Sequence, residues 1–391
     1  MRKICACLLA LAVLLSLAPV ALAAGDGHDY DRALAAREGV NTRVMDELLA
    51  LHGVRELAED FYTGDFAVLL NDGRVVYTGR IGTDELDWTR ILPQWREMET
   101  IFTTEHDYTL CYGIDRQGVL HVAAPEGFFQ GIEGWRDVAQ LSDGLFSGCW
   151  AVTKDGRLLC SKTDPETNPL LARAAGLIDQ DWTDLVQVEY RGGGSPANGQ
   201  DLYGVRRDGT LLYFGNPYPE DWDAPAEISG SVLSLPGEQV ERVWPYSFYL
   251  LILRRDGSLR VLETGESYLG DQPPYWMENW KDVAEIVSVD DDLTLALCRD
   301  DTVLFRAAPE KAEAYRGMQA WSKVLQLRYG YDHVAALCAD GTVLAAGEND
   351  WGQCEVSGWR DVVKLYAGYR WTIGLTRDGE VLIAGLYEPY D

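Results

Sequence analysis

The sequence predicts an all-β fold of repeated small antiparallel sheets, a β-propeller of seven or eight blades, after a short N-terminal helical segment. Segments that begin at Trp321 and Trp359 carry the same residues 38 positions apart, and their turn glycines, Gly341 and Gly379, have the same spacing. A fixed period of this size is typical of repeat architectures. Eight such units can be followed from Val54 onward.

The most regular mark of the units is an Asp-Gly pair between apolar runs. Such a pair predicts a hairpin with a two-residue type I′ turn, in which both central residues have positive φ. These aspartates are therefore expected to form turns, not to act as catalytic acids. The pairs are Asp72-Gly73, Asp155-Gly156, Asp208-Gly209, Asp256-Gly257, Asp340-Gly341 and Asp378-Gly379, with Gln117-Gly118 and Asp300-Asp301 in the two remaining units.

Each turn is flanked by two apolar positions, four residues before and two residues after its second member. Across a two-residue loop these positions are expected to point to opposite faces of the sheet, so that both faces are apolar. A sheet that buries both faces must lie between other sheets, as the blades of a propeller do. The first set is Leu69, Ile114, Val152, Val205, Leu253, Leu297, Leu337 and Leu375; the second is Val75, Leu120, Leu158, Leu211, Leu259, Val303, Val343 and Val381.

A tryptophan three residues before an apolar strand residue opens most units. Its repetition predicts packing between blades. The residues are Trp95, Trp135, Trp182, Trp280, Trp321 and Trp359.

The N-terminus predicts export. A basic start at Arg2 and Lys3, an apolar run over 8–17 and the small-residue site at 21–23 are typical of a secretory signal peptide. We expect a signal peptide over 1–23, a helical segment over 24–53 and the repeat domain over 54–391. The destination would be extracellular or the cell envelope, with no membrane span in the mature chain.

The segment over 24–53 is expected to contain a short helix, with an earlier turn of helix around Arg32 to Arg37 as a further candidate. Asn41 is a candidate cap, and Gly53 follows its end. The apolar side would carry Val44, Met45, Leu48 and Leu49.

Composition and charge limit the partner. The hydrophobic content of 47% is enough for a packed core. The formal charge of −28, with no basic cluster, argues against nucleic acid as a partner. Six cysteines follow residue 24, but none forms a Cys-x-x-Cys pair, so a zinc site is not expected. Cys298 and Cys338 occupy equivalent places in neighbouring units, which are too far apart for a disulfide.

No motif for catalysis, cofactor binding or metal binding is present. The five histidines lack metal-ligand spacing, and no nucleophile elbow or phosphate loop occurs. The Asp290–Asp292 run lacks the spaced ligands of a calcium loop and is expected to be a turn. We therefore expect a chain that is not an enzyme and needs no cofactor or metal.

The C-terminal units resemble the repeat of the regulator-of-chromosome-condensation family. The residues that carry the resemblance are Gly330-Tyr-Asp-His333, Gly347-Glu-Asn-Asp-Trp-Gly352-Gln353, and Gly368-x-x-Trp371 with Gly374-Leu375 and Asp378-Gly379-x-Val381. The resemblance implies a β-propeller, usually of seven four-stranded blades, and a structural role for His333. The export signal and the missing basic tail separate this chain from the family's nucleotide-exchange members, so that activity is not carried over. It is most similar to exported bacterial members.

Loops between the first and second strands of the units should gather on one face. Tyrosines and acidic residues are mixed there, which suits protein or peptide recognition. The expected function is an exported binding module. The alternatives are an extracellular glycan-active hydrolase or lyase with a carboxylate pair on one face, which makes a glycan the alternative ligand, and a purely structural cell-surface repeat. The candidate binding residues are Tyr246, Asp291, Tyr331, Asp332, Tyr369 and Arg370.

Overall fold

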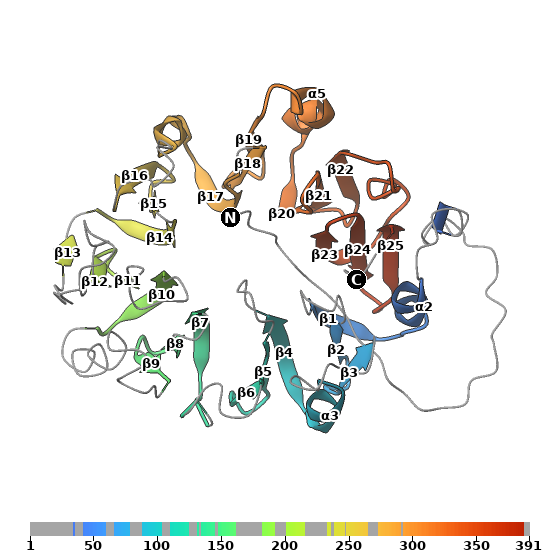
Figure 1. The fold of residues 1–391 in the computed structure, drawn as a ribbon, viewed down its shortest axis with the longest axis horizontal. Helices are drawn as coiled ribbons and strands as arrows, with labels where there is room; N and C mark the ends of the chain where they lie inside the picture. The colour runs from blue at the N-terminus through green and yellow to red at the C-terminus, as the bar shows by residue number, and fades with distance from the viewer. Residues whose placement is uncertain are drawn as a thin grey trace, which may run out of the picture. The chain divides into compact units, whose positions relative to one another are not determined.

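The computed structural model describes residues 34–35, 42–59, 66–78, 88–103, 110–124, 131–132, 134–144, 148–161, 182–191, 201–215, 233–235, 238–246, 248–264, 273–290 and 292–386. Residues 1–23, where a signal peptide is predicted, lie outside these ranges, as do Asn41 and Asp291. Eight antiparallel sheets follow one another along the chain, each in simple sequence order. This confirms an all-β propeller with eight blades, and each repeat unit of the sequence corresponds to one sheet (Figure 1).

The chain divides into two compact units, residues 1–116 with 284–391 and residues 117–283. We refer to them as unit 1 and unit 2. Strands that begin in unit 1 are β1 (Val54–Glu59), β2 (Phe66–Leu70), β3 (Val75–Thr78), β4 (Met98–Thr103), β5 (Cys111–Asp115), β18 (Leu293–Cys298), β19 (Val303–Ala307), β20 (Val324–Tyr329), β21 (His333–Cys338), β22 (Val343–Gly347), β23 (Val362–Gly368), β24 (Trp371–Thr376) and β25 (Val381–Gly385).

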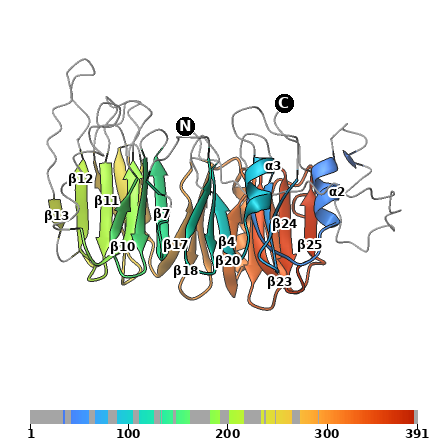
Figure 2. The ribbon, with the colours of Figure 1, turned by 90° about the horizontal axis from the view of Figure 1, so that it is seen from below.

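Unit 2 contains a sheet of four strands, whereas the other sheets have three strands in the described residues. Its β10, β11 and β12 are extended by a short β13 at the outer edge (Figure 2). Strands that begin in unit 2 are β6 (Leu120–Ala123), β7 (Val138–Gly144), β8 (Gly148–Thr153), β9 (Leu158–Cys160), β10 (Leu185–Arg191), β11 (Asp201–Arg206), β12 (Leu211–Gly215), β13 (Leu233–Leu235), β14 (Val240–Pro245), β15 (Tyr249–Arg254), β16 (Leu259–Glu263) and β17 (Val283–Ser288).

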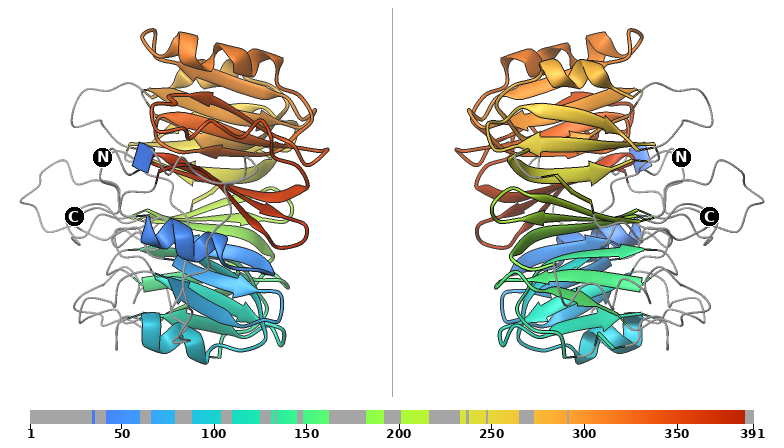
Figure 3. Two further views of the ribbon diagram at one scale, coloured as in Figure 1. Left: turned by 90° about the vertical axis from the view of Figure 1, so that its right-hand side faces the viewer. Right: turned by 90° about the vertical axis from the view of Figure 1, so that its left-hand side faces the viewer.

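Helices are short and lie outside the sheets. The predicted helix is α2 (Arg43–Leu49), which buries Val44, Met45 and Leu48 and packs against β3 and β25 (Figure 3). Helix α2, which precedes the first sheet in the chain, thus contacts the last sheet within unit 1. The others are α3 (Trp88–Ile91), η1 (Leu92–Gln94), η2 (Tyr275–Asn279), α5 (Ala312–Tyr315) and η3 (Arg316–Ala320).

The hairpin turns differ from the predicted type. In the turn after β21, Gly341 has φ of 80° whereas Asp340 does not have positive φ. Gly341 N–H donates to Cys338 O, and Cys338 N–H donates to Thr342 O, so the loop has three residues and ends in a left-handed glycine. The Asp340 carboxylate accepts the Thr342 N–H at 3.1 Å. The prediction of a two-residue type I′ turn was therefore wrong, although the aspartates do form the turns.

The longer loop also corrects the predicted faces. Leu337 and Val343 are direct cross-strand partners and so share a face. They lie in the core between this sheet and the next, with Trp359, whereas Val334 and Ala336 lie in the core on the other side, with Trp321. Both faces of the sheet are thus buried, as predicted. However, the two residues that flank the turn lie on the same face, and it is alternate residues of the middle strand that point to opposite faces.

Four of the six leading tryptophans, Trp95, Trp182, Trp321 and Trp359, are buried as predicted, whereas Trp135 and Trp280 are half-buried. Trp182 is buried with residues of two successive sheets in unit 2. A Cβ on the middle-strand Gly204 would lie 2.7 Å from the Trp182 ring, so glycine is needed there to make room for the indole. Gly113 and Gly374 stand in the same relation to Trp95 and Trp359.

A side chain of the innermost strand fastens one sheet to the next. In unit 2, Gln187 accepts the Val243 N–H at 2.9 Å and donates to Val243 O at 3.0 Å. Gln140 makes the same pair of bonds to Val188. The amide occupies the otherwise open edge of the neighbouring strand, where unpaired backbone groups are a liability. We call this arrangement the edge clasp.

Candidate binding surface

Four side chains form a compact cluster at the loops β20–β21, β22–β23 and β23–β24 of unit 1. The rings of Tyr331 and Tyr369 meet edge to face with centroids 5.0 Å apart. The guanidinium of Arg370 lies 4.2 Å from the ring centroid of Trp351 and 4.7 Å from that of Tyr369. Each of these contacts is of the cation–π type. We call Tyr331, Trp351, Tyr369 and Arg370 the aromatic shelf.

The backbone under the shelf is fixed by tight turns. Tyr331 has φ of 72°, a left-handed conformation that is costly for a residue with a Cβ. The turn is closed by Gly330 N–H donating to His333 O at 2.9 Å. A Cβ on Gly330 would clash with the His333 ring and with Gly368 O of the neighbouring loop. The two loops are therefore in direct backbone contact, which holds their tyrosines together.

A buried polar chain supports the same loops from below. His333 is fully buried, and its Nε2 lies 2.8 Å from Oγ1 of Thr372. Thr372 donates in turn to Gln353 O at 2.8 Å. Burial lowers the pKa of His333 to about 4, so the ring is neutral at pH 7. The structural role expected for His333 is consistent with this position.

Trp351 is placed by the loop between β22 and β23. The backbone N–H of Trp351 donates to Oε1 of the buried Gln353 at 3.0 Å, and Asn349 Oδ1 accepts the backbone N–H of Cys354 at 2.8 Å. Side chains of the loop thus replace regular backbone pairing and fix its shape. This explains why an Asn and a Gln stand at these places in the repeat motif.

Beside the shelf, one ammonium group is held by two carboxylates. Lys311 Nζ lies 2.5 Å from Asp332 and 3.1 Å from Asp292. Burial alone would lower the pKa of Lys311, but its bonds to Asp332 and Asp292 outweigh this and raise the pKa. Glu348 joins the group through its N–H, which donates to Asp332 O at 2.8 Å. Burial, and then the charge of Asp332, raise the pKa of Glu348.

Four of the six predicted binding residues come together in unit 1. Tyr331 and Asp332 are half-buried, Tyr369 is 36% exposed, and Arg370 lies against its ring. Tyr246 belongs to unit 2, where it stacks on Tyr249 at 4.7 Å. Asp291 is outside the described residues.

Two participants were not predicted from the sequence. Trp351 was not separated from the other tryptophans, although its place inside the motif Gly347–Gln353 could have marked it as displayed by a rigid loop. Lys311 lies in an irregular connection between β19 and β20 with no pattern around it. No sequence signal would have found it.

Tyr246 in unit 2 is held through its backbone. Arg191 donates to Tyr246 O at 2.6 Å and to Thr264 Oγ1 at 2.8 Å. The same guanidinium pairs with Asp201, which is fully buried and also accepts the Tyr213 hydroxyl at 2.7 Å. The Arg191–Asp201 pair therefore fixes the β14–β15 loop to the sheet before it.

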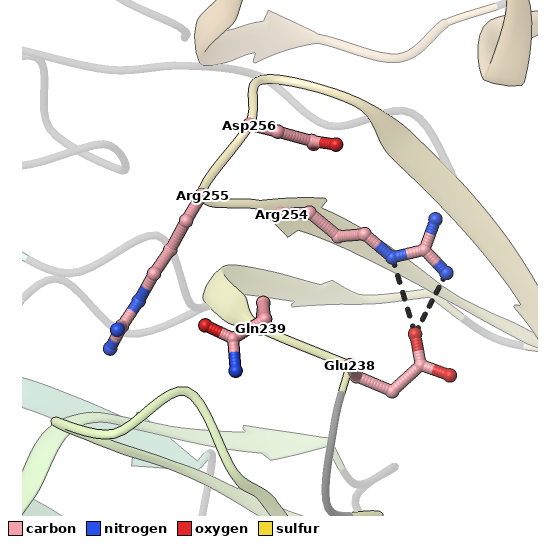
Figure 4. Close-up of a pocket in the computed structure, with 5 residues that line it drawn as sticks. All are labelled: Glu238, Gln239, Arg254, Arg255 and Asp256. Carbon is pink, nitrogen blue, oxygen red and sulfur yellow. Dashed lines mark hydrogen bonds and ion pairs between the residues drawn. The ribbon is translucent and has the colours of Figure 1, made fainter.

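A surface hollow of about 590 Å³ lies near the turn ends of strands in unit 2. Glu238, Gln239, Arg254, Arg255 and Asp256 line it (Figure 4). Arg254 is turned toward Glu238, at 2.8 Å, while Arg255 points the other way. Glu238 also pairs with Arg260, and these bonds from arginine hold the pKa of Glu238 below its usual range. Glu238 pairs with Arg254, Arg255 donates to Arg207 O, and Asp256 accepts from Ser258. Each charged group of the lining thus has a partner already, so the hollow has no evident preference for a ligand.

Among the described residues, no group of three or more His, Cys, Asp or Glu side chains is arranged to hold a metal ion. Within the same residues, no helix has the length and apolar character to cross a membrane.

The chain matches no known protein family and no curated protein. Solved propeller structures do resemble it. The CRINKLY WD40 ectodomain of the Arabidopsis thaliana receptor kinase ACR4 is 12% identical, with 87% of this chain and 98% of that chain covered and a TM-score of 0.42. The computationally designed protein Ika8 is 13% identical (86% and 96% covered, TM-score 0.45). Prp20p of Saccharomyces cerevisiae is 14% identical (86% and 83% covered, TM-score 0.36). These likenesses concern the fold alone.

Proposed function

We propose that this chain is an exported β-propeller binding module that recognises a protein or peptide through loops joining the first and second strands of its blades. The observation that carries the proposal is the aromatic shelf, where Tyr331, Tyr369 and Arg370 from two loops meet beside Trp351. As part of the same proposal, we regard the chain as similar to the exported members of the regulator-of-chromosome-condensation family.

The composition of the shelf supports recognition of a polypeptide. Tyr, Trp and Arg are enriched at the energetic centres of protein interfaces. Tyr369 is among the few large apolar side chains exposed in the described residues. A tyrosine has only two side-chain torsions, so little conformational entropy is lost when a partner packs on it.

The rigidity of the loops supports it further. The left-handed Tyr331, the backbone contact of Gly330 with Gly368 and the His333–Thr372 bond fix the shelf before any partner arrives. A preorganised surface avoids part of the ordering cost of association.

Capture of extracellular proteins by the purified chain tests this function. Tyr369→Ala should reduce capture by about tenfold or more, the loss of roughly 1.4 kcal/mol or more that is typical of a hot spot. The melting temperature should not change, because Tyr369 is exposed. The control is Tyr275→Ala, which removes another exposed tyrosine, at 43%, outside these loops. Equal loss of capture in both variants would contradict the proposal.

Export is tested separately. N-terminal sequencing of the secreted protein should begin near residue 24, after the small-residue site at 21–23. Recovery of the chain only inside the cell, with its first residues intact, would contradict this part of the proposal.

A further inference from the structure

We infer that the partner segment recognised by the aromatic shelf is basic, presenting lysine or arginine side chains; the inference rests on the proposed binding function. The surface consists of the shelf and the adjoining acidic residues Asp292, Asp332, Glu348 and Asp350. Three kinds of observation carry the inference.

The first is continuity between aromatic rings and carboxylates. Asp332 directly follows Tyr331, and Asp350 directly precedes Trp351. Glu348 is bound through its N–H to Asp332 O. Asp332 and Asp350 are therefore chain neighbours of two residues of the shelf, and Glu348 is joined to Asp332 by a backbone bond. This combination suits a cation, which gains from the π face of a ring and from a carboxylate at the same time.

The second is that the surface already holds two cations of this chain. The Lys311 ammonium sits between Asp292 and Asp332, and the Arg370 guanidinium lies on the rings of Trp351 and Tyr369. Both kinds of basic side chain are thus accommodated within the surface itself. These internal contacts are independent of each other, because one uses carboxylates and the other uses rings.

The third is the balance of charge. The surface contains four carboxylates against one lysine and one arginine, and the whole chain has a formal charge of −28. The long-range field of such a chain accelerates encounter with a basic partner and repels an acidic one. Tyr369, which is 36% exposed, supplies the apolar contact that charge alone would lack.

The test uses the purified chain and three fluorescent peptides of about 12 residues. The peptides share one frame of Tyr, Leu and Gly and differ only at four positions, which carry Lys, Gln or Glu. The Lys peptide should have a dissociation constant at least about tenfold lower than the Gln peptide, and the Glu peptide should bind most weakly. The affinity of the Lys peptide should fall as NaCl is raised from about 50 to about 500 mM, because salt screens exposed charges.

Matched variants locate the effect. Glu348→Gln with Asp350→Asn removes two exposed carboxylates from the surface and should weaken the Lys peptide by about tenfold. The control, Asp378→Asn with Glu380→Gln, removes the same charge at the turn between β24 and β25 and should change affinity by less than about twofold.

Equal affinity for the Lys and Gln peptides would overturn the inference and leave peptide binding in place. Equal loss in both double variants would also overturn it, because only net charge would then be recognised. If no peptide binds while Tyr369-dependent capture of extracellular proteins persists, the basic partner is wrong but the binding function stands. If capture fails as well, both are wrong.

Discussion

The Nε2 atom of His333 lies 2.8 Å from Oγ1 of Thr372, across the seam between the sheets of β20–β22 and β23–β25. The Thr372 hydroxyl has one proton, which it donates to Gln353 O. Its oxygen must therefore accept from His333, so Nε2 carries the proton of the neutral ring. A second proton would place a positive charge in a fully buried site.

Acid should therefore weaken the fold through His333. Its pKa is lowered to about 4 in the folded chain, from about 6.5 in the unfolded one. The stabilising contribution is fully present above about pH 6.5 and is lost as the pH falls toward 4, by about 3 kcal/mol in total. Urea unfolding at pH 7 and at about pH 4.5 measures the loss.

The variant His333→Gln removes the titrating group. Between these two pH values its free energy of unfolding should fall by roughly 2 kcal/mol less than that of the natural chain. An unchanged slope in His333→Gln would show that other groups cause the acid sensitivity. Hydrogen bonds hold the pKa of Asp72, Asp208 and Asp340 below the usual range of an aspartate. These turn carboxylates therefore keep their charge to lower pH than an ordinary aspartate.

The turn glycines should be among the least replaceable residues of the fold. Gly257 has φ of +78°, and a Cβ there would lie 2.7 Å from the Asp282 Cα at the start of the next sheet. Gly257→Ala should therefore lower the free energy of unfolding by about 2–4 kcal/mol, from the left-handed backbone and the clash together. Chemical denaturation measures this.

Gly317→Ala provides the comparison. This glycine lies in η3, and nothing stands within 4 Å of where its Cβ would be. Alanine should change stability there by less than about 1 kcal/mol, and any change should be a gain, since alanine restricts the unfolded chain. Similar losses at both glycines would refute the argument that close approach of the next sheet fixes Gly257.

The sequence was sufficient for the fold because its signals are local and repeated. The residue types at Leu337, Gly341 and Val343 recur with the same spacing in other units, and each position has the same structural role there. The turn type was missed because Asp-Gly fits both a two-residue loop and the end of a three-residue one. Only the bond from Cys338 N–H to Thr342 O distinguishes them.

The binding surface was only partly predictable for a different reason. Tyr331 and Tyr369 occupy equivalent places in neighbouring units, so their meeting follows from the repeat itself. Lys311 reaches Asp332 from an irregular connection, and Arg370 turns onto Trp351 of another loop. Contacts of that kind depend on loop conformation, which has no periodic signal.

The edge clasp predicts a stability cost at a residue that carries no motif. Gln187→Met keeps the length and apolar stem of the side chain but removes both bonds to Val243. The buried N–H and C=O of Val243 would then lack a partner, which should cost about 2–3 kcal/mol of the free energy of unfolding. Val186→Ala, at the exposed neighbouring position, should cost less than about 0.5 kcal/mol. Comparable effects of the two changes would mean that the clasp adds nothing to the contact between sheets.

Lys311 should be needed most when the carboxylates around it are charged. Lys311→Met leaves Asp292, Asp332 and Glu348 without the ammonium that now separates them. At pH 7 we expect a loss of about 1 kcal/mol in the free energy of unfolding, modest because the group is partly exposed to solvent. As the pH falls and the carboxylates take up protons, their repulsion disappears and the two proteins should approach equal stability. The comparison variant, Arg316→Met, breaks an exposed pair with Glu313 and should have no measurable effect at either pH. A loss in Lys311→Met that stays constant with pH would indicate that the aliphatic stem, and not the charge, is what the surface requires.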